Sequence, residues 1–360
     1  MKIITLESFS EKIHSSIKSR RVPLDVSFEL TYRCNNNCVH CFCNLPYNNS
    51  KALKEELTTE EIKNILDELS EMGCLWLLFT GGEPLLRDDF EDIYLYAKKR
   101  GFIITLFTNG TLINSKIINL FSHYPPFSVE ITLYGATEET FEKVTRKKGS
   151  YKNCLSGIQR LLNAGLHLKL KAMAITLNMH EIDEMHNIAH KFKCDFRFDT
   201  AIQKRIDSNS FSTPEQYRLS PDETVAIDIK FPYRKEAFKD ICTKFDISQR
   251  DNTRLYQCNA GRFSMHINPY GIAMGCMMMI NDGFSIREHG LKWIWENEIL
   301  SVINSKKDFA LPCDECTLIN ICGQCPGWSM VEFNDVRTVT PFLCETAKKR
   351  NKEMKLLDAY

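Results

Sequence analysis

Three cysteines near the N-terminus, Cys34, Cys38 and Cys41, are separated by three and then two residues. They directly follow a short apolar segment that is typical of a buried strand. Thiolates are soft ligands that suit zinc or iron–sulfur clusters. Three thiolates leave one iron of a 4Fe-4S cluster without a protein ligand, and that iron is free to bind a small molecule. A tetrahedral zinc ion is the alternative, with a fourth ligand from His40 or Cys43.

A second set of cysteines lies near the C-terminus. Its members are Cys258, Cys276, Cys313, Cys316, Cys322, Cys325 and Cys344. The four central cysteines form two CxxC pairs, which would suit a four-thiolate zinc ribbon. A ribbon would leave the other three cysteines unexplained, whereas iron–sulfur clusters can use all of them. The spacing therefore favours clusters over zinc.

The elements that would position these groups are found between residues 24 and 205. Short apolar runs alternate there with amphipathic segments, as expected of a parallel sheet covered by crossover helices. The predicted strands cover residues 26–30, 75–79, 103–107, 129–133, 168–175 and 196–198. The predicted helices cover residues 58–71, 89–99, 115–121, 138–144, 152–163 and 182–192. The order of elements suits a six-stranded partial barrel, and it would equally suit a doubly wound sheet.

The candidate reactive groups follow these strands. The three cysteines come after the first predicted strand, the sequence Gly-Gly-Glu-Pro at 81–84 after the second, Thr108 and Asn109 after the third, and Tyr134 after the fourth. In parallel α/β folds the carboxyl ends of the strands carry the reactive groups. We therefore expect features that are scattered in the sequence to converge at one edge of the sheet.

The three-cysteine loop and the Gly-Gly-Glu-Pro sequence together resemble the radical S-adenosylmethionine (SAM) superfamily. The resemblance implies an α/β fold, a partial (β/α)6 TIM-like barrel. It also implies a 4Fe-4S cluster held by Cys34, Cys38 and Cys41, and reductive cleavage of SAM to a 5'-deoxyadenosyl radical. By this resemblance Phe42 lies beside the adenine, Glu83 receives the ammonium group and Thr132 contacts the ribose. The full set of implied SAM contacts is Phe42, Gly81, Gly82, Glu83, Pro84, Thr108, Asn109 and Thr132.

The C-terminal cysteines resemble a SPASM domain, a small irregular cysteine-rich domain with two auxiliary 4Fe-4S clusters. The resemblance assigns Cys258, Cys276 and Cys325 to the first auxiliary cluster. It assigns the second cluster to Cys313, Cys316, Cys322 and Cys344. The interval between Cys322 and Cys325 is one residue shorter than the usual pattern, and Ser264 stands where some relatives have a fourth ligand. We therefore expect an open iron in the first auxiliary cluster, with Cys242 as another possible ligand.

Composition limits the partners and the compartment. Lys and Arg together equal Asp and Glu at 46 each, so no basic excess exists for nucleic-acid binding. No apolar run reaches the eighteen or so residues that span a bilayer. Fifteen cysteines without an N-terminal apolar signal segment indicate a reducing cytoplasm. Three of the other cysteines are expected to be small core residues, namely Cys74, Cys154 and Cys194.

These patterns divide the chain into five parts. Residues 1–23 are an N-terminal extension, 24–205 the radical SAM barrel, 206–254 a bridging region punctuated by prolines, 255–350 the SPASM domain and 351–360 a tail. Only 33 residues precede Cys34, too few for the leader-binding module that many relatives carry. We therefore expect leader recognition to need a separate protein or another surface of the chain.

The resemblance favours a maturase that installs a thioether or carbon–carbon crosslink in a ribosomally made precursor peptide, with flavodoxin or ferredoxin as reductant. Tailoring of a small molecule or tetrapyrrole is an alternative enzyme function. Formylglycine formation in a sulfatase is a further one, although Met277 stands where those maturases have an aspartate base. An iron–sulfur electron-transfer or scaffold protein is the non-enzyme alternative. The proton acceptor stays unassigned among Glu130, Tyr134, Asp199 and Asp282, because that choice needs geometry.

Overall fold

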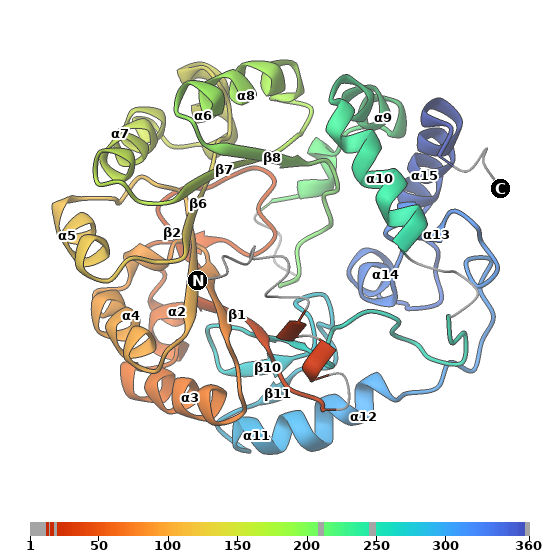
Figure 1. Ribbon diagram of the computed structural model, residues 1–360, viewed down its shortest axis with the longest axis horizontal. Helices are drawn as coiled ribbons and strands as arrows, with labels where there is room; N and C mark the ends of the chain where they lie inside the picture. The colour runs from red at the N-terminus through yellow and green to blue at the C-terminus, as the bar shows by residue number, and fades with distance from the viewer. Residues whose placement is uncertain (1–11, 14, 18–19, 208–211, 245–249, 357–360) are drawn as a thin grey trace.

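Six parallel strands form the centre of the molecule in the computed structural model, which describes residues 12–13, 15–17, 20–207, 212–244 and 250–356. They occur side by side in chain order. They are β1 (Asp25–Thr31), β4 (Trp76–Gly81), β5 (Ile103–Thr108), β6 (Ser128–Thr132), β7 (Leu168–Met173) and β8 (Asp195–Asp199). All six predicted strands are therefore present, and the predicted α/β partial-barrel fold is confirmed. Figure 1 shows the helices around the outside of the curved sheet.

Alternation along the strands separates two faces of the sheet. Phe28, Phe79 and Leu106 point towards the helices and are fully buried in the hydrophobic core. Their neighbours, such as Ser27, Thr80 and Phe107, line an interior cavity instead. Successive side chains of a strand point to opposite faces, so each strand contributes to both the core and the cavity.

The covering helices follow the strands as predicted. They are α3 (Thr59–Glu71), α4 (Phe90–Lys99), α5 (Ser115–His123), α6 (Glu138–Thr145), α7 (Ser150–Asn163) and α8 (Ile182–Lys191), with short 3-10 turns η1 (Pro84–Leu86) and η2 (Met179–Glu181). Three small elements in the loop after β1 were not predicted, because each is too short to show periodicity. They are β2 (Arg33–Cys34), β3 (Leu45–Pro46) and α2 (Ser50–Glu55).

The predicted bridging region contains a 3-10 turn and two helices: η3 (Pro214–Tyr217), α9 (Pro221–Lys230) and α10 (Pro232–Lys244). Each of the three prolines in this region begins one of these elements. Proline is favoured in the first turn of a helix, because its missing N–H has no intrahelical partner there. These prolines mark helix starts as well as chain turns.

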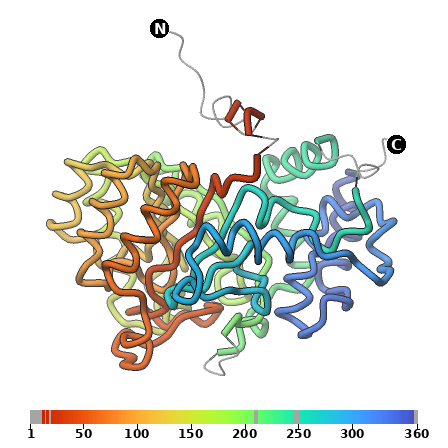
Figure 2. The backbone as a smooth tube through the Cα atoms, turned by 90° about the horizontal axis from the view of Figure 1, so that it is seen from below, coloured from red at the N-terminus to blue at the C-terminus, as the bar shows by residue number. Residues whose placement is uncertain are grey.

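The C-terminal region continues the main sheet. Strand β9 (Ser264–Ile267) pairs in parallel with β1, followed by β10 (Ile272–Met274) and β11 (Phe284–Ser285) in antiparallel order. The remaining elements are α11 (Leu291–Trp293), the π-helical turn η5 (Ile294–Ile299), α12 (Leu300–Ile303), α13 (Ile319–Cys322), α14 (Pro326–Phe333) and α15 (Pro341–Met354). Figure 2 shows the last of these, in blue, on the side of the molecule opposite the orange and yellow barrel helices.

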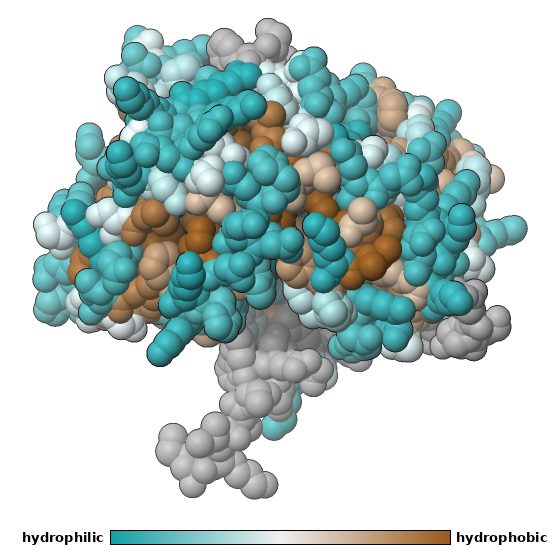
Figure 3. Space-filling model, turned by 90° about the horizontal axis from the view of Figure 1, so that it is seen from above, coloured by the Kyte–Doolittle hydropathy of each residue, from teal (hydrophilic) through white to brown (hydrophobic). Residues whose placement is uncertain are grey.

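The surface offers no continuous apolar face in the view of Figure 3, where hydrophobic patches are interrupted by hydrophilic side chains. Large exposed hydrophobic residues come from separate elements, for example Leu53, Tyr124 and Trp293. Within the described part of the chain, no helix is long and apolar enough to cross a membrane.

Helix α3 begins with a capping box whose loss can be measured. The Thr58 backbone N–H donates to Glu61 Oε2 at 2.7 Å, and the Glu61 N–H donates to Thr58 Oγ1 at 3.3 Å. Replacing Thr58 by alanine should lower the free energy of unfolding by about 1 kcal/mol in urea titrations, because the Glu61 N–H loses its acceptor. Thr243→Ala is the matched control, since Thr243 is exposed within α10. Equal effects of the two substitutions would contradict the capping role.

Candidate functional site

A cavity of about 640 Å³ lies inside the partial barrel. Most of the predicted SAM and cluster residues line it: Cys34, Cys38, Cys41, Phe42, Gly81, Gly82, Thr108, Asn109 and Thr132. Met277 and Met278, which directly follow Cys276, border the same cavity. Segments far apart in the sequence therefore converge at the carboxyl ends of the strands. Glu83 and Pro84 are not among the lining residues.

The three-cysteine loop is fixed from both sides. The N–H groups of Asn37 and Val39 donate to the carbonyls of Thr145 and Val144 at 2.9 and 3.0 Å, which ties the loop to the end of α6. On the other side the buried Arg205 guanidinium donates to the Cys41 carbonyl at 3.2 Å. These bonds hold the backbone, so the thiols are presented on a rigid loop.

Cys38 is buried and Cys34 and Cys41 are half-buried, and their thiols lie close enough to act on one another. Burial, together with neighbouring acidic groups that include Glu83 and Cys41, raises the pKa of Cys34 to about 12. The pKa of Cys38 is also raised, first by burial and then by Cys34 and Cys41. The pKa of Cys41 is instead lowered to about 7, mainly by its hydrogen bond with Cys43. A metal cluster bound here would favour the thiolate form of all three side chains, because metal binding releases their protons.

Unpaired polar atoms show where such a group would fit. Both amide atoms of Asn36 and the Nδ1 of His40 are buried without a hydrogen-bond partner, and both residues line the cavity. The Asn109 amide reaches the Cys34 sulfur at 3.8 Å, a long contact of the kind that N–H groups make to cluster thiolates. The donor set of the loop therefore fits a cysteine-held iron–sulfur cluster with a further bound group.

The compact geometry of a zinc site is not found in this loop. Among the described residues, no three His, Cys, Asp or Glu side chains are arranged to hold a single metal ion. Zinc–sulfur bonds of about 2.3 Å would draw the sulfurs close together around one point. The cysteine spacing and the Gly-Gly-Glu-Pro sequence are what favour a cluster over zinc.

Gly81 and Gly82 allow two segments of backbone to pack together. Gly81 has a φ of +123°, and a Cβ there would lie 2.2 Å from the Thr31 carbonyl oxygen. A Cβ on Gly82 would lie 2.3 Å from the Arg33 carbonyl oxygen. The Gly82 N–H donates to the Thr31 carbonyl at 2.6 Å. The glycines, predicted from resemblance to contact SAM, therefore also hold the segment after β4 against the chain that enters the cysteine loop.

Replacing Gly82 by alanine should lower the free energy of unfolding by about 3 kcal/mol, because the new methyl group meets rigid backbone. Denaturant titration of the chain measures the change. Gly290→Ala is the control, since a Cβ there would approach only the flexible Glu68 side chain, at 3.4 Å. A Gly82 variant as stable as this control would disprove the steric role.

The Glu83 carboxylate is fully buried and positions the turn after β5. It accepts hydrogen bonds from the Thr108 hydroxyl and the Asn109 N–H, both at 2.8 Å, and from the Leu85 N–H at 3.1 Å. Burial raises its pKa to about 7, against the lowering effect of these bonds. Contact between Glu83 and the SAM ammonium stays a prediction; the observed bonds show how it orders Thr108 and Asn109. Pro84 is buried and begins η1.

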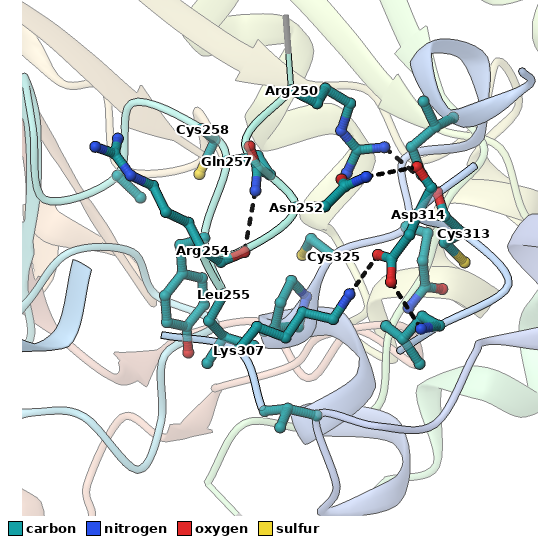
Figure 4. Close-up of a pocket in the computed structure, with 18 of the residues that line it drawn as sticks. Arg250, Asn252, Arg254, Leu255, Gln257, Cys258, Lys307, Cys313, Asp314 and Cys325 are labelled. Carbon is teal, nitrogen blue, oxygen red and sulfur yellow. Dashed lines mark hydrogen bonds and ion pairs between the residues drawn. The ribbon is translucent and has the colours of Figure 1, made fainter. Parts of the chain in front are cut away.

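The C-terminal cysteines gather in two groups. Cys258, Cys276 and Cys325 line a pocket of about 170 Å³. Burial is the main cause that raises the pKa of Cys325, and the nearby thiols of Cys276 and Cys258 raise it further. In the other group, burial and then the nearby thiols of Cys344, Cys313 and Cys316 raise the pKa of Cys322. Figure 4 shows Cys258 and Cys325 on the wall of the pocket, with Cys313 of the other group at its edge.

The short interval between Cys322 and Cys325 is accommodated by a tight turn. Cys322 ends α13, Gly323 follows in the left-handed conformation with a φ of +78°, and Cys325 caps the start of α14. This turn sends the two thiols to different groups. Cys242 packs, as Cys322 does, against the small apolar cluster that includes Ile321 and Ala347. Ser264 is not among the residues that line the pocket of the first group.

Several residues of the cavity wall were missed by sequence reasoning. Lys171 lies beside Thr132 and Arg197 on neighbouring strands, and its amine is 2.8 Å from the centre of the Phe107 ring. Burial lowers its pKa well below the usual range. Ser27, Glu29 and His266 also line the cavity. The alternation of side chains along β1 and β7 could have placed Ser27, Glu29 and Lys171 on the cavity face of the sheet. His266 has no such signal, because its strand has only four residues.

Residues 28–189 match the model of the Radical SAM superfamily. The match spans most of the barrel and the cysteine loop, so this part of the chain is similar to radical SAM domains, and the similarity indicates an enzyme. The similarity implies a 4Fe-4S cluster and SAM as cofactors. The alternative of an electron-transfer or scaffold protein without radical chemistry is therefore not supported.

Two curated relatives cover most of the chain. An AdoMet-dependent heme synthase of Methanosarcina barkeri is 24% identical over 343 residues, covering 91% of this chain and 97% of the relative. The mycofactocin maturase MftC of Mycobacterium tuberculosis is 27% identical over 311 residues, which cover 83% of this chain and 77% of MftC. The structure of Streptococcus suis SuiB bound to precursor peptide SuiA aligns with a TM-score of 0.70 at 16% identity, covering 93% of this chain and 80% of SuiB. This last likeness supports the fold.

Proposed function

We propose that this enzyme is a maturase of ribosomally synthesised peptides that installs an oxidative thioether or carbon–carbon crosslink. The observation that carries the proposal is the shared cavity, whose wall includes the three-cysteine loop at one place and Met277 and Met278, next to Cys276, at another. A substrate side chain in that cavity would lie between a radical source and a second group of thiols. The similarity to the mycofactocin maturase supports a peptide as substrate.

In this proposal Cys34, Cys38 and Cys41 hold the SAM-binding cluster, and Phe42, Gly81, Gly82, Glu83, Pro84, Thr108, Asn109 and Thr132 hold SAM. When bound, the cluster and SAM supply a 5'-deoxyadenosyl radical that abstracts a substrate hydrogen. The residues of the chain orient both reactants and exclude water. Buried walls such as Phe107 and Phe198 suit that task.

The C-terminal cysteines would hold two auxiliary 4Fe-4S clusters, on Cys258, Cys276 and Cys325 and on Cys313, Cys316, Cys322 and Cys344. Formation of a crosslink is a net oxidation, so an electron must leave the substrate after hydrogen abstraction. The grouping of the thiols supports this division. The first cluster would have one iron without a cysteine ligand.

The partners and the compartment follow from this chemistry. SAM cleavage needs a low-potential reductant, for which flavodoxin or ferredoxin is suited. The leader of the precursor peptide would be bound by a separate protein or by another surface of this chain. A reducing cytoplasm is the compartment that we propose, because the cysteines would stay available there as cluster ligands.

Coexpression tests the peptide proposal. The chain is expressed with each short reading frame that lies beside its gene, and the peptides are analysed by mass spectrometry. We expect one peptide to lose about 2 Da for each crosslink formed, because each crosslink removes two hydrogens. Coexpression with Cys38→Ala should leave the same peptide unmodified. Unmodified peptides from every neighbouring frame, with an enzyme that cleaves SAM, would contradict a peptide substrate.

Tetrapyrrole tailoring is the second candidate, because the alignment spans nearly the whole Methanosarcina barkeri heme synthase. Arg197 on the cavity wall could receive an acidic side chain of such a substrate. Incubation with Fe-coproporphyrin III, SAM and dithionite distinguishes the candidates. Loss of carbon dioxide from the porphyrin would favour the tetrapyrrole, and an unchanged porphyrin would favour the peptide.

A further inference from the structure

Three polar side chains of the cavity wall, the buried Glu29 and His266 and the half-buried Ser27, form a chain of hydrogen bonds. Ser27 and Glu29 lie two residues apart on β1, and His266 lies opposite Ser27 in the parallel pairing of β1 with β9. The His266 Nδ1 is 2.7 Å from Ser27 Oγ, and its Nε2 is 3.0 Å from Glu29 Oε2. His266 is only 3% exposed and Glu29 only 2%.

The partners determine which nitrogen of His266 carries the proton. For a neutral imidazole facing an ionised Glu29, the geometry assigns the hydrogen to Nε2, because a carboxylate only accepts hydrogen bonds. Nδ1 is then an acceptor, and the Ser27 hydroxyl donates to it. The arrangement therefore presents a basic nitrogen behind a hydroxyl in the cavity, with a carboxylate placed to stabilise the imidazolium.

The acidic and phenolic groups considered as bases from the sequence have other partners. Glu130 pairs with Arg197 at 2.7 Å, and Asp199 accepts from the Thr200 N–H at 2.7 Å. Asp282 accepts from the Tyr256 hydroxyl at 3.0 Å, outside the residues that line the cavity. Tyr134 is buried against Cys38. Lys171 also lines the cavity and is the other candidate for the proton acceptor.

We propose that Ser27, His266 and Glu29 form the proton relay that receives the proton released when the substrate is oxidised. The inference rests on the proposed peptide function. Hydrogen abstraction breaks a substrate C–H bond and leaves a carbon radical. Formation of the C–X bond, where X is the nucleophilic atom of the crosslink, then breaks an X–H bond and releases one proton and one electron. The proton passes through the Ser27 hydroxyl to His266 Nδ1.

The electron needs an acceptor of the iron–sulfur class, and the position of the relay suits one on the C-terminal cysteines. His266 pairs with Met274 across β9 and β10, two residues before Cys276. Met277 and Met278 border the same cavity as Ser27. Proton and electron would therefore leave the substrate on the same side of the cavity.

The tautomer is tested first, in the full chain and without a substrate. The chain is labelled with ¹⁵N-histidine, and the His266 signals are assigned by their loss in His266→Gln. We expect a protonated Nε2 and an unprotonated Nδ1, with the Nε2 proton shifted by Glu29→Gln. A hydrogen on Nδ1 would overturn the relay, because that nitrogen could not accept a proton.

The second arm measures coupling with the peptide identified by coexpression. His266→Gln should lower product formation about 100-fold, the usual loss for a proton acceptor, and raise the ratio of 5'-deoxyadenosine to product at least about tenfold. Ser27→Ala should cause a smaller loss. The proposal would be overturned if His266→Gln formed product within about twofold of wild type. It would also be overturned if Lys171→Met alone raised the ratio of 5'-deoxyadenosine to product. If no peptide is modified, the proposed peptide function is wrong. The tautomer of His266 is measured without a substrate, so it still tests whether Nδ1 can accept a proton.

Matched controls separate the relay from general disruption. His186→Gln removes a histidine that packs on Phe196 and Phe231, with ring centres 5.9 Å apart in each pair. Ser128→Ala removes a buried hydroxyl without a hydrogen-bond partner, also on a sheet strand. Neither residue lines the cavity. Uncoupling by either control would assign the effect to packing and overturn the relay.

Discussion

Replacing Cys38 by alanine should reduce SAM cleavage to the level produced by the reagents alone. Cys38 is buried, and burial and then the nearby thiols of Cys34 and Cys41 raise its pKa, which places it beside both of the other predicted ligands. A cluster with two remaining thiolates would lose the geometry that leaves one iron open to SAM. The measurement is 5'-deoxyadenosine formed anaerobically from SAM and dithionite.

Cys154→Ala is the control for this prediction. Cys154 is fully buried in the hydrophobic core beneath the site and packs beside Gly110. Its truncation should cost about 1–2 kcal/mol of stability and leave SAM cleavage intact. If Cys38→Ala still formed 5'-deoxyadenosine above background, the three-cysteine loop would not hold the SAM-binding cluster.

Replacing Cys325 by alanine should stop product formation while SAM is still cleaved. Cys325 groups with Cys258 and Cys276, away from the three-cysteine loop, so its loss removes only the first auxiliary cluster. The iron content should fall by about four atoms per chain. Iron analysis and the two product assays on the same reconstituted sample measure all three quantities.

Cys242→Ala is the matched control, because Cys242 lies near the cluster-binding region but packs beside Ile321 and Ala347. It should keep its full iron content and its product. A Cys325 variant that retained all of its iron would remove this residue from the auxiliary cluster, and one that lost SAM cleavage would show that the two sites are not separate.

Much of the barrel could be predicted because its signals are local. The six parallel strands have alternating or continuous apolar patterns, and the cysteine spacing lies within a few residues of sequence. The pairing of β9 with β1 could not be predicted in this way, since it joins segments more than 200 residues apart and β9 is a strand of four residues. A short strand carries too little periodicity to reveal its partner.

The candidate site likewise has features that the sequence predicts and features that only the structure reveals. The convergence of the cysteine loop, the glycines and Asn109 follows from their positions after parallel strands. The bonding of Glu83 to Thr108 and Asn109 required coordinates, because a carboxylate has no sequence signal for the backbone groups it will meet. The relay depends on a contact between Ser27 and His266, from opposite ends of the chain.

The most direct test of the cysteine assignments is the metal content of the anaerobically reconstituted chain, measured together with 5'-deoxyadenosine formation. Three 4Fe-4S clusters require about twelve irons per chain, and we expect that content with SAM cleavage. About four irons with cleavage would retain the radical enzyme and remove both auxiliary clusters. Zinc in place of iron, without cleavage, would contradict the assignment of all ten cysteines.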